Sequence, residues 1–157
     1  MLGGRLGEGG LEVRQYLARS LAEEPAILAA LRAELPSRPI VISYNGKAYD
    51  WNHLQGRCAY HGLGALPEPL HLDLLFFARR RWGQALLGCS LPEVEQAVLG
   101  IARELDVPGE YVPSLYGTYL RTGSAELLRP VIAHNREDVV TLARLLSVLL
   151  ERVTGPG

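Results

Sequence analysis

Cysteine and lysine are scarce in this sequence of 157 residues. The two cysteines, Cys58 and Cys89, lie far apart and have no second pair, which excludes a disulfide framework and a thiolate metal site. Such sparse cysteine is typical of a reducing compartment, so we expect a cytoplasmic protein. Lys47 is the only lysine, and the formal net charge is −1. The net charge therefore does not indicate a nucleic-acid partner, since proteins that bind nucleic acid commonly carry an excess of positive charge.

Long apolar runs are also absent. No stretch approaches the roughly 20 residues that span a bilayer, and the N-terminus lacks the basic-then-apolar pattern of a secretion signal. We therefore expect no membrane contact. The sequence contains no repeat, linker or low-complexity tract, and its 48% hydrophobic residues suit a globular core. These features predict a single domain over residues 1–157.

The order of the expected elements indicates an α/β domain. Residues 1–18 read as two short strands joined by a turn at residues 7–10, and a helix follows over residues 22–35. The segment PIVISY, residues 39–44, is rich in β-branched residues and predicts a strand that is parallel and buried on both faces. A mixed sheet with a helical tail is expected from this order. The remaining expected elements are a helix over residues 51–61, a short strand and helix from residue 70, and helices over residues 91–100, 113–120 and 126–153.

The segment YNGKAYD, residues 44–50, places Asp50 just beyond the expected buried strand. In open α/β sheets this edge is where functional sites collect. The same residue types also suit a purely structural role, with Asn45 and Gly46 forming a turn and Asp50 capping a helix.

The segment AHNREDVV, residues 133–140, places His134 and Asp138 four residues apart on a helix, so both lie on one face. A carboxylate there can hold a divalent cation while the imidazole orients a water molecule. The structural alternative is a solvated helix start with ordinary polar residues.

Together these segments resemble the second and third motifs of the ribonuclease-H-like DEDD exonuclease superfamily. The sequence between these segments is similar to those of a narrower group, the YprB-like predicted exonuclease domains. This similarity covers nearly the whole chain. The matching segments are residues 45–47, 71–74, 79–82, 89–91 with Glu95, 106–109, Pro113 with Tyr116, and 134–135.

This resemblance implies a ribonuclease-H-like fold and metal-dependent 3′–5′ hydrolysis of DNA or RNA by two Mg²⁺ or Mn²⁺ ions. Asp50 and Asp138 match the acidic residues of the second and third motifs and would bind metal. His134 would position the attacking water, although it stands at a tyrosine position of the matching subgroup, and the histidine subgroup uses a spacing one residue longer. The expected substrate contacts are Asn45, Lys47 and Asn135.

The sequence departs from the family pattern at its start. An Asp-x-Glu pair on a preceding strand is expected, but no such pair occurs before residue 45. The domain is therefore expected to be N-terminally incomplete, to lack its first central strand, and to be weak or inactive. A misassigned or truncated start, a pseudoenzyme and a strand supplied by another chain all remain open. A catalytically dead module that binds nucleic acid or protein is the alternative function.

Four further expectations concern the rest of the chain. The gap in the sheet would be closed by the opening hairpin sliding against residues 39–44, or by a homodimer through the exposed edge. Arg79–Arg81 with Trp82 could follow a phosphate backbone, or could be a solvated helix end. Asp73 is expected to fix a loop, and His53, His61 and His71 to be surface or packing residues.

Overall fold

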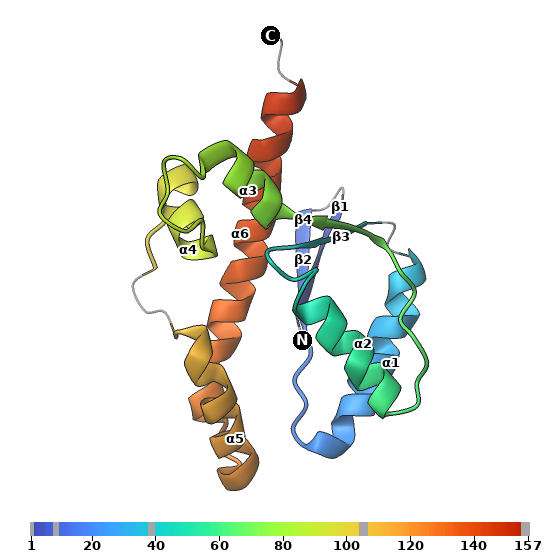
Figure 1. Ribbon diagram of the computed structural model, residues 1–157. Coiled ribbons are helices and arrows are strands. Elements are labelled where there is room, and N and C mark those ends of the chain that lie inside the picture. Colours follow the sequence, from blue (N-terminus) through green and yellow to red (C-terminus); the bar gives the residue numbers. More distant parts are fainter. Residues whose placement is uncertain (1, 8–9, 38–39, 104–106, 155–157) are drawn as a thin grey trace. The chain divides into compact units, whose positions relative to one another are not determined.

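The computed structural model describes residues 2–7, 10–37, 40–103 and 107–154. The chain divides into two compact units, one made of residues 20–94 and the other of residues 1–19 and 95–157. Their strands form two sheets, the parallel pair β3–β4 and the antiparallel pair β1–β2 (Figure 1). The expected strands are thus present, as two separate pairs in the described part of the chain rather than as one mixed sheet.

The unit of residues 20–94 is built around two helices and two short parallel strands. Its helices and strands are α1 (Glu24–Glu34), β3 (Ile40–Ser43), α2 (Asp50–Tyr60), β4 (Leu70–Asp73), α3 (Leu74–Trp82) and α4 (Leu91–Val94). The pairing aligns Ile40 with Leu70 and Ser43 with Asp73, so both strands end together. The expected parallel strand is confirmed, and this shared carboxyl edge is where Asp50 was predicted to lie.

Helices α1 and α2 pack side by side around a small apolar core (Figure 1). Leu28 and Leu35 from the first helical segment meet Cys58 from α2 and Leu66, and all four are buried. Polar contacts join the same helices, because Arg57 Nε donates to Glu24 Oε1 at 2.7 Å and His61 Nε2 lies 2.8 Å from Glu24 Oε2. The hydrogen bonds from Arg57 lower the pKa of Glu24 to about 2.

Strand β3 is more exposed than its sequence predicts. Ile40 keeps 49% of its surface accessible, and the other three residues of the strand are only half-buried. The expectation of a strand buried on both faces is therefore wrong. The physical reason is that β4 is the one described strand that pairs with β3, so little of the sheet surface is covered.

The second unit combines the opening hairpin with the C-terminal helices. Strand β1 (Leu2–Gly7) pairs with β2 (Gly10–Gln15), which confirms the predicted hairpin, although two residues of the expected turn, 8 and 9, lie outside the described residues. Helix α6 (Arg129–Thr154) packs against this hairpin. Gln15 Nε2 donates to the carbonyl of Ile132 at 2.8 Å and thereby ties the hairpin to the first turns of α6.

Helix α5 and the turn that follows α4 also belong to this unit. Helix α5 (Val112–Thr122) ends at Gly123, whose φ of 71° is a left-handed conformation that glycine adopts without a steric penalty. The predicted helix over residues 91–100 is present as α4 followed by the wider π turn η3 (Glu95–Leu99). This turn carries Glu95 into the interior, where it is 3% exposed. Within the described residues, no helix has the length and apolar character needed to cross a membrane.

Candidate functional site

The loop after β3 is held in shape by one buried carboxylate from β4. Asp73 Oδ1 accepts from the backbone N–H of Asn45 at 2.7 Å and of Leu75 at 3.1 Å, and Asp73 Oδ2 accepts from the N–H of Lys47 at 3.1 Å. Burial acts to raise the pKa of Asp73, but these bonds outweigh it and lower the pKa. The prediction that Asp73 fixes a loop is confirmed.

The loop has little room at its turn. Asn45 adopts a φ of 60°, a left-handed conformation that asparagine tolerates better than most residues. A Cβ on Gly46 would lie 2.8 Å from the Cβ of Ser43 and 2.9 Å from Asp50 Oδ2. Glycine at position 46 therefore lets the carboxylate of Asp50 fold back over the turn.

Asp50 is the first residue of α2, and Tyr49 occupies the N-cap position. The alternative interpretation, in which Asp50 caps this helix, therefore does not describe the structure. Burial raises the pKa of its carboxyl, although the residue as a whole is exposed. Asn45 and Lys47, the other predicted site residues in this unit, are also exposed, with their backbone N–H groups committed to Asp73.

Helix α6 brings His134 and Asp138 together as its sequence predicts. Asp138 Oδ2 lies 3.3 Å from His134 Nε2, and Thr141 follows one turn further along the same face. Asn135 is the next residue after His134 on α6 and is half-buried. Asp50 belongs to the other unit, so a shared metal region for Asp50 and Asp138 remains a prediction.

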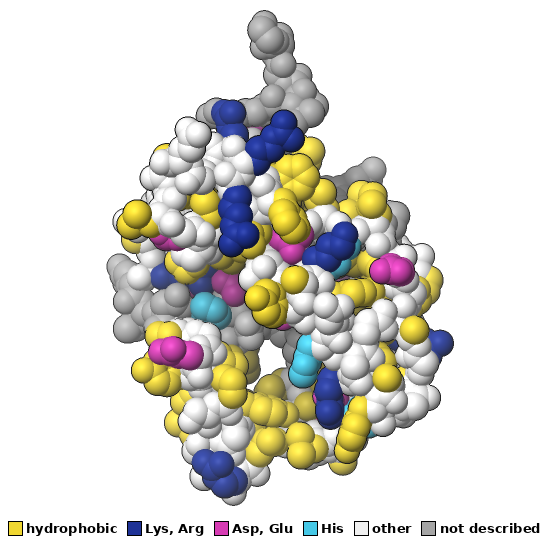
Figure 2. Space-filling view, in the orientation of Figure 1, with side chains coloured by type: hydrophobic (Ala, Val, Ile, Leu, Met, Phe, Trp, Pro, Cys, Tyr) yellow, Lys and Arg dark blue, Asp and Glu magenta, His cyan; other side chains and the backbone are white. Residues whose placement is uncertain are grey.

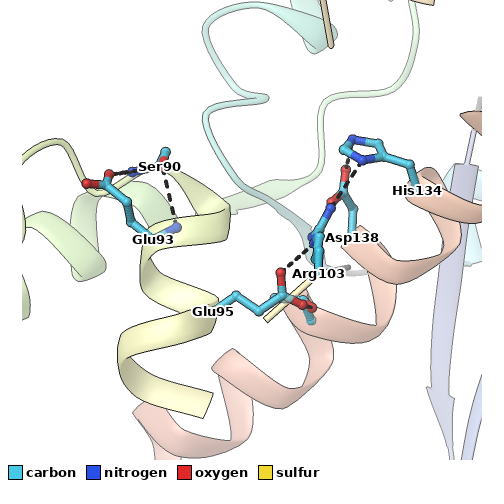
Figure 3. A network of polar contacts seen from close by, with 7 residues as sticks. Ser90, Glu93, Glu95, Arg103, His134 and Asp138 are labelled. Carbon is cyan, nitrogen blue, oxygen red and sulfur yellow. Dashed lines mark hydrogen bonds and ion pairs between the residues drawn. The ribbon is translucent and has the colours of Figure 1, made fainter. Parts of the chain in front are cut away.

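A residue that sequence analysis missed, Arg103, connects this face of α6 to η3 (Figure 3). Its Nη2 donates to Asp138 Oδ1 at 2.7 Å, its Nε donates to Glu95 Oε2 at 2.6 Å, and its Nη1 lies 3.2 Å from His134 Nδ1. Glu95 also accepts a short hydrogen bond from the hydroxyl of Thr141. Arg103 precedes the Asp-Val-Pro-Gly segment without any spacing signal of its own.

This network fixes the proton of His134. Arginine carries only donors, so His134 Nδ1 must accept from Arg103, and the ring proton must lie on Nε2, facing Asp138. Both ring nitrogens are therefore engaged within the chain. His134 can therefore position a water molecule only after one of these two contacts has opened.

The donor set does not fit a divalent cation as it is arranged. Glu95, Asp138 and His134 converge on the guanidinium of Arg103, which already supplies a positive charge. Among the described residues, no group of three or more His, Cys, Asp or Glu side chains could hold a metal ion. The oxygens of Asp73 are taken by backbone N–H groups, so Asp73 adds no free ligand beside Asp50.

The arginines of α3 are exposed. Exposure is expected both for a segment that contacts phosphates and for a solvated helix end, so it does not separate these two interpretations. Arg79, Arg80 and Arg81 line an open hollow together with Leu87 and Cys89. In Figure 2, the coloured Lys and Arg side chains appear as separate groups among hydrophobic ones on the face shown. The two interpretations of α3 remain open.

Comparison with known proteins adds a family match and one relative. A family model described as the RNase H superfamily matches residues 3–150. The chain is 36% identical over 143 residues to the uncharacterized protein YprB of Bacillus subtilis (strain 168). That similarity covers 90% of this chain but 34% of the relative, so the chain spans about a third of the length of that protein.

Proposed function

Because this chain belongs to the RNase H superfamily, with a YprB-like domain, we propose that it acts on nucleic acid as a 3′–5′ exonuclease-type domain. The superfamily and the YprB-like resemblance expected from the sequence are confirmed, and the α/β fold is of the nuclease-like type. The proposal also holds that the 157-residue chain alone hydrolyses phosphodiester bonds slowly or not at all.

The observation that carries the proposal is the pairing of His134 with Asp138 on one face of α6. Asp138 matches the acidic residue of the third exonuclease motif, and Asp50 matches that of the second. His134 stands at a tyrosine position of the matching subgroup. In the proposed function Asp50 and Asp138 are the acidic residues of the reaction, and His134 positions water. Asn45, Lys47 and Asn135 contact the substrate backbone, where the ammonium of Lys47 suits a phosphate.

Low activity is expected from the electrostatics of Asp138. Hydrolysis of this type uses two Mg²⁺ or Mn²⁺ ions between four carboxylates. In this chain Asp138 is paired with Arg103, and no Asp-x-Glu pair occurs before residue 45. The residues as placed do not suit two metal ions, so no catalytic step can be assigned to them in this arrangement.

The test is digestion of end-labelled single- and double-stranded DNA and RNA with Mg²⁺ or Mn²⁺. We expect the chain to be no faster than its Asp138→Ala variant. Rapid digestion that Asp138→Ala and Asp50→Ala abolish would overturn the expected weakness while supporting the exonuclease assignment. The matched controls are Glu137→Ala and Glu68→Ala, each of which changes an exposed acid in the same unit as the aspartate it is compared with. Digestion at the same rate by the wild type, Asp138→Ala and Asp50→Ala would come from a contaminant and would count against the exonuclease assignment.

The pairing of Arg103 with Asp138 favours a second candidate, a module that binds nucleic acid without cleaving it. Such a module would still use Lys47 for phosphate contact. Lys47→Gln should then weaken binding of a labelled oligonucleotide and lower the slope of log affinity against log salt by about one unit. An unchanged affinity and slope would count against nucleic-acid contact at this loop.

A further inference from the structure

We infer that the outer face of α3 binds single-stranded nucleic acid, with two phenylalanine rings stacking on bases and three arginines contacting phosphates. This face, called the α3 face below, consists of Phe76, Phe77, Arg79, Arg80 and Arg81. The inference rests on the proposed action on nucleic acid, and it adds the form of the substrate and a second contact surface. It requires neither cleavage nor a metal ion, so it can be tested separately from digestion.

Phenylalanine is rare in this chain and lies at its surface. The sequence contains two phenylalanines, and both belong to α3, where Phe76 is 64% exposed and Phe77 is 44% exposed. An exposed ring forgoes the stabilisation that burial would give, so two adjacent exposed rings indicate a contact surface. The buried residues of the same helix are Leu74, Leu75 and Ala78. Helix α3 therefore packs through a different face, and the two rings are accessible to a partner.

The helical spacing places rings and guanidinium groups alternately around the outside of α3. On a helix of about 3.6 residues per turn, successive side chains are rotated by about 100°. This rotation gives, around the exposed side of the helix, the order Arg79, Phe76, Arg80, Phe77 and Arg81. Each ring thus has an arginine one turn away on either side. The helix dipole favours arginines in a last turn, but it gives no role to the rings.

The positive charge of the α3 face has no acidic counterpart in its own segment. Residues 74–92 contain no Asp or Glu, so the three arginines are the charged side chains of this stretch. Among the described residues, no ion pair joins any of these arginines to a carboxylate. The same arginines line the open hollow that reaches Leu87. Guanidinium donors match phosphate oxygens in pairs, so an anionic chain complements this face.

The start of α3 is joined to the loop of the candidate site by one carboxylate. Asp73 caps α3 by accepting from the N–H of Leu75, and it also accepts from the N–H groups of Asn45 and Lys47. The loop that carries Lys47 and the helix that carries the α3 face are thus held together within one unit. This arrangement allows one strand to contact both Lys47 and the α3 face.

Flat rings favour single-stranded nucleic acid over the other partners that an apolar and basic face can bind. In a duplex each base is already stacked on its neighbours, whereas a single strand leaves base faces open to an aromatic ring. An anionic lipid surface takes up apolar side chains whether or not they are flat. Trp82 is half-buried, so Phe76 and Phe77 are the more accessible rings of α3. The shape of the side chain at position 76 therefore distinguishes the two classes of partner.

The test is fluorescence anisotropy of labelled oligo(dT) and oligo(U) of about 12 nucleotides, in EDTA so that metal-dependent cleavage does not occur. We expect Phe76→Leu to weaken binding at least about fivefold, because the variant keeps an apolar side chain and loses the stacking ring. Phe76→Tyr keeps a ring and should stay within about twofold of the wild type. An oligo(dT)–oligo(dA) duplex should bind more weakly than either single strand. The matched control is Tyr60→Leu, which removes a ring that is 74% exposed in the same unit and should leave the affinity unchanged.

The dependence of binding on salt tests the phosphate contacts. Arg80 lies between the two rings, and Arg80→Gln should lower the slope of log affinity against log salt by about 0.7 unit for a single strand. Arg32→Gln changes an exposed arginine of α1 in the same unit and should leave the slope unchanged. Equal slopes for Arg80→Gln and the wild type would remove the phosphate contact from the α3 face and overturn the inference.

The outcomes separate this inference from the proposed function. Oligonucleotide binding that Lys47→Gln weakens and Phe76→Leu does not would overturn the inference and leave the proposed function standing. The absence of both binding and digestion of any nucleic acid would overturn the two together. Equal weakening by Phe76→Leu and Phe76→Tyr would exclude stacking. Tighter binding to vesicles of phosphatidylserine and phosphatidylcholine than to oligonucleotide would assign the α3 face to a membrane surface and would also overturn the inference.

A measurement on the wild type does not depend on the folding of any variant. An oligonucleotide that contains iodouridine crosslinks on irradiation to an aromatic ring stacked on that base. We expect the crosslinked peptide to contain Phe76 or Phe77, because these rings are exposed beside the arginines. Crosslinks confined to peptides outside α3 would overturn the inference.

Discussion

Asp73 shows how one side chain can determine the shape of a candidate site that it does not itself form. Its two oxygens accept three backbone N–H groups, two from the loop after β3 and one from the start of α3. The loop carries Asn45 and Lys47, and its turn at Gly46 lies against Asp50. The position of all three predicted site residues therefore depends on a carboxylate that is 4% exposed.

At this scale we predict that Asp73→Asn destabilises the chain by about 1–3 kcal/mol. The amide replaces one accepting oxygen by a donor, so at least one buried N–H group loses its partner. Urea unfolding measures the change, and Glu68→Gln, an exposed acid in the same unit, should stay within about 0.5 kcal/mol. Equal stability of Asp73→Asn and the wild type would show that the loop does not need this acceptor.

Sequence could identify Asp50, His134 and Asp138 as candidates because each stands in a recognisable segment, and it could assign Asp73 to a loop. It could not identify Arg103. A guanidinium reaches its partners through a long side chain, and its contacts to Glu95 and Asp138 join residues 8 and 35 positions away. No periodicity in the sequence indicates such pairs. The contacts that both ring nitrogens of His134 make with Arg103 and Asp138 could therefore not be predicted either.

At the scale of elements, the positions of helices were easier to predict than the burial of the strands. The apolar spacing of residues 22–35 and 126–153 corresponds to α1 and α6, because one face of each helix packs inward. Strand β3 was located correctly, but the exposure of Ile40 was not foreseen. A run of β-branched residues reports a preference for strand and does not report how many neighbours the strand has.

Helix α6 offers a matched pair of leucines for testing its packing. Leu145 is 0% exposed and Leu150 is 52% exposed on the same helix. We predict that Leu145→Ala lowers the free energy of unfolding by about 2–5 kcal/mol, since it leaves a cavity. Leu150→Ala should cost less than about 1 kcal/mol in the same urea titration. Equal costs would mean that α6 packs through a different face.

At the scale of the whole molecule, we expect association to occur through the edge of β3 that pairs with no other strand in the described part of the chain. Unpaired N–H and C=O groups along a strand edge recruit other strands, and exposed Ile40 and Leu70 border this sheet. A homodimer through this edge stays a prediction, as does the alternative in which the opening hairpin slides against residues 39–44. The single-domain interpretation of residues 1–157 likewise stays a prediction beside the two compact units.

Sedimentation velocity tests whether the chain forms a homodimer through the edge of β3. We expect the chain to form a species of about twice its 17.2 kDa mass at micromolar concentration. Ile40→Lys should shift it to the monomer, because pairing two edges would bring like charges together. Leu21→Lys changes a residue that is 68% exposed in the same unit and should leave the mass unchanged. A wild type that sediments as a monomer at every concentration would contradict association through the edge.

The covalent attachment of Arg103 has a consequence for how the α6 network responds to its surroundings. A dissolved ion leaves a site when it is diluted or captured by a chelator, whereas a tethered guanidinium keeps a constant effective concentration beside Asp138. The contacts among Glu95, Arg103 and His134 should thus persist in EDTA and at any metal level. This part of the chain keeps its charge balance independently of the metal supply of the cell.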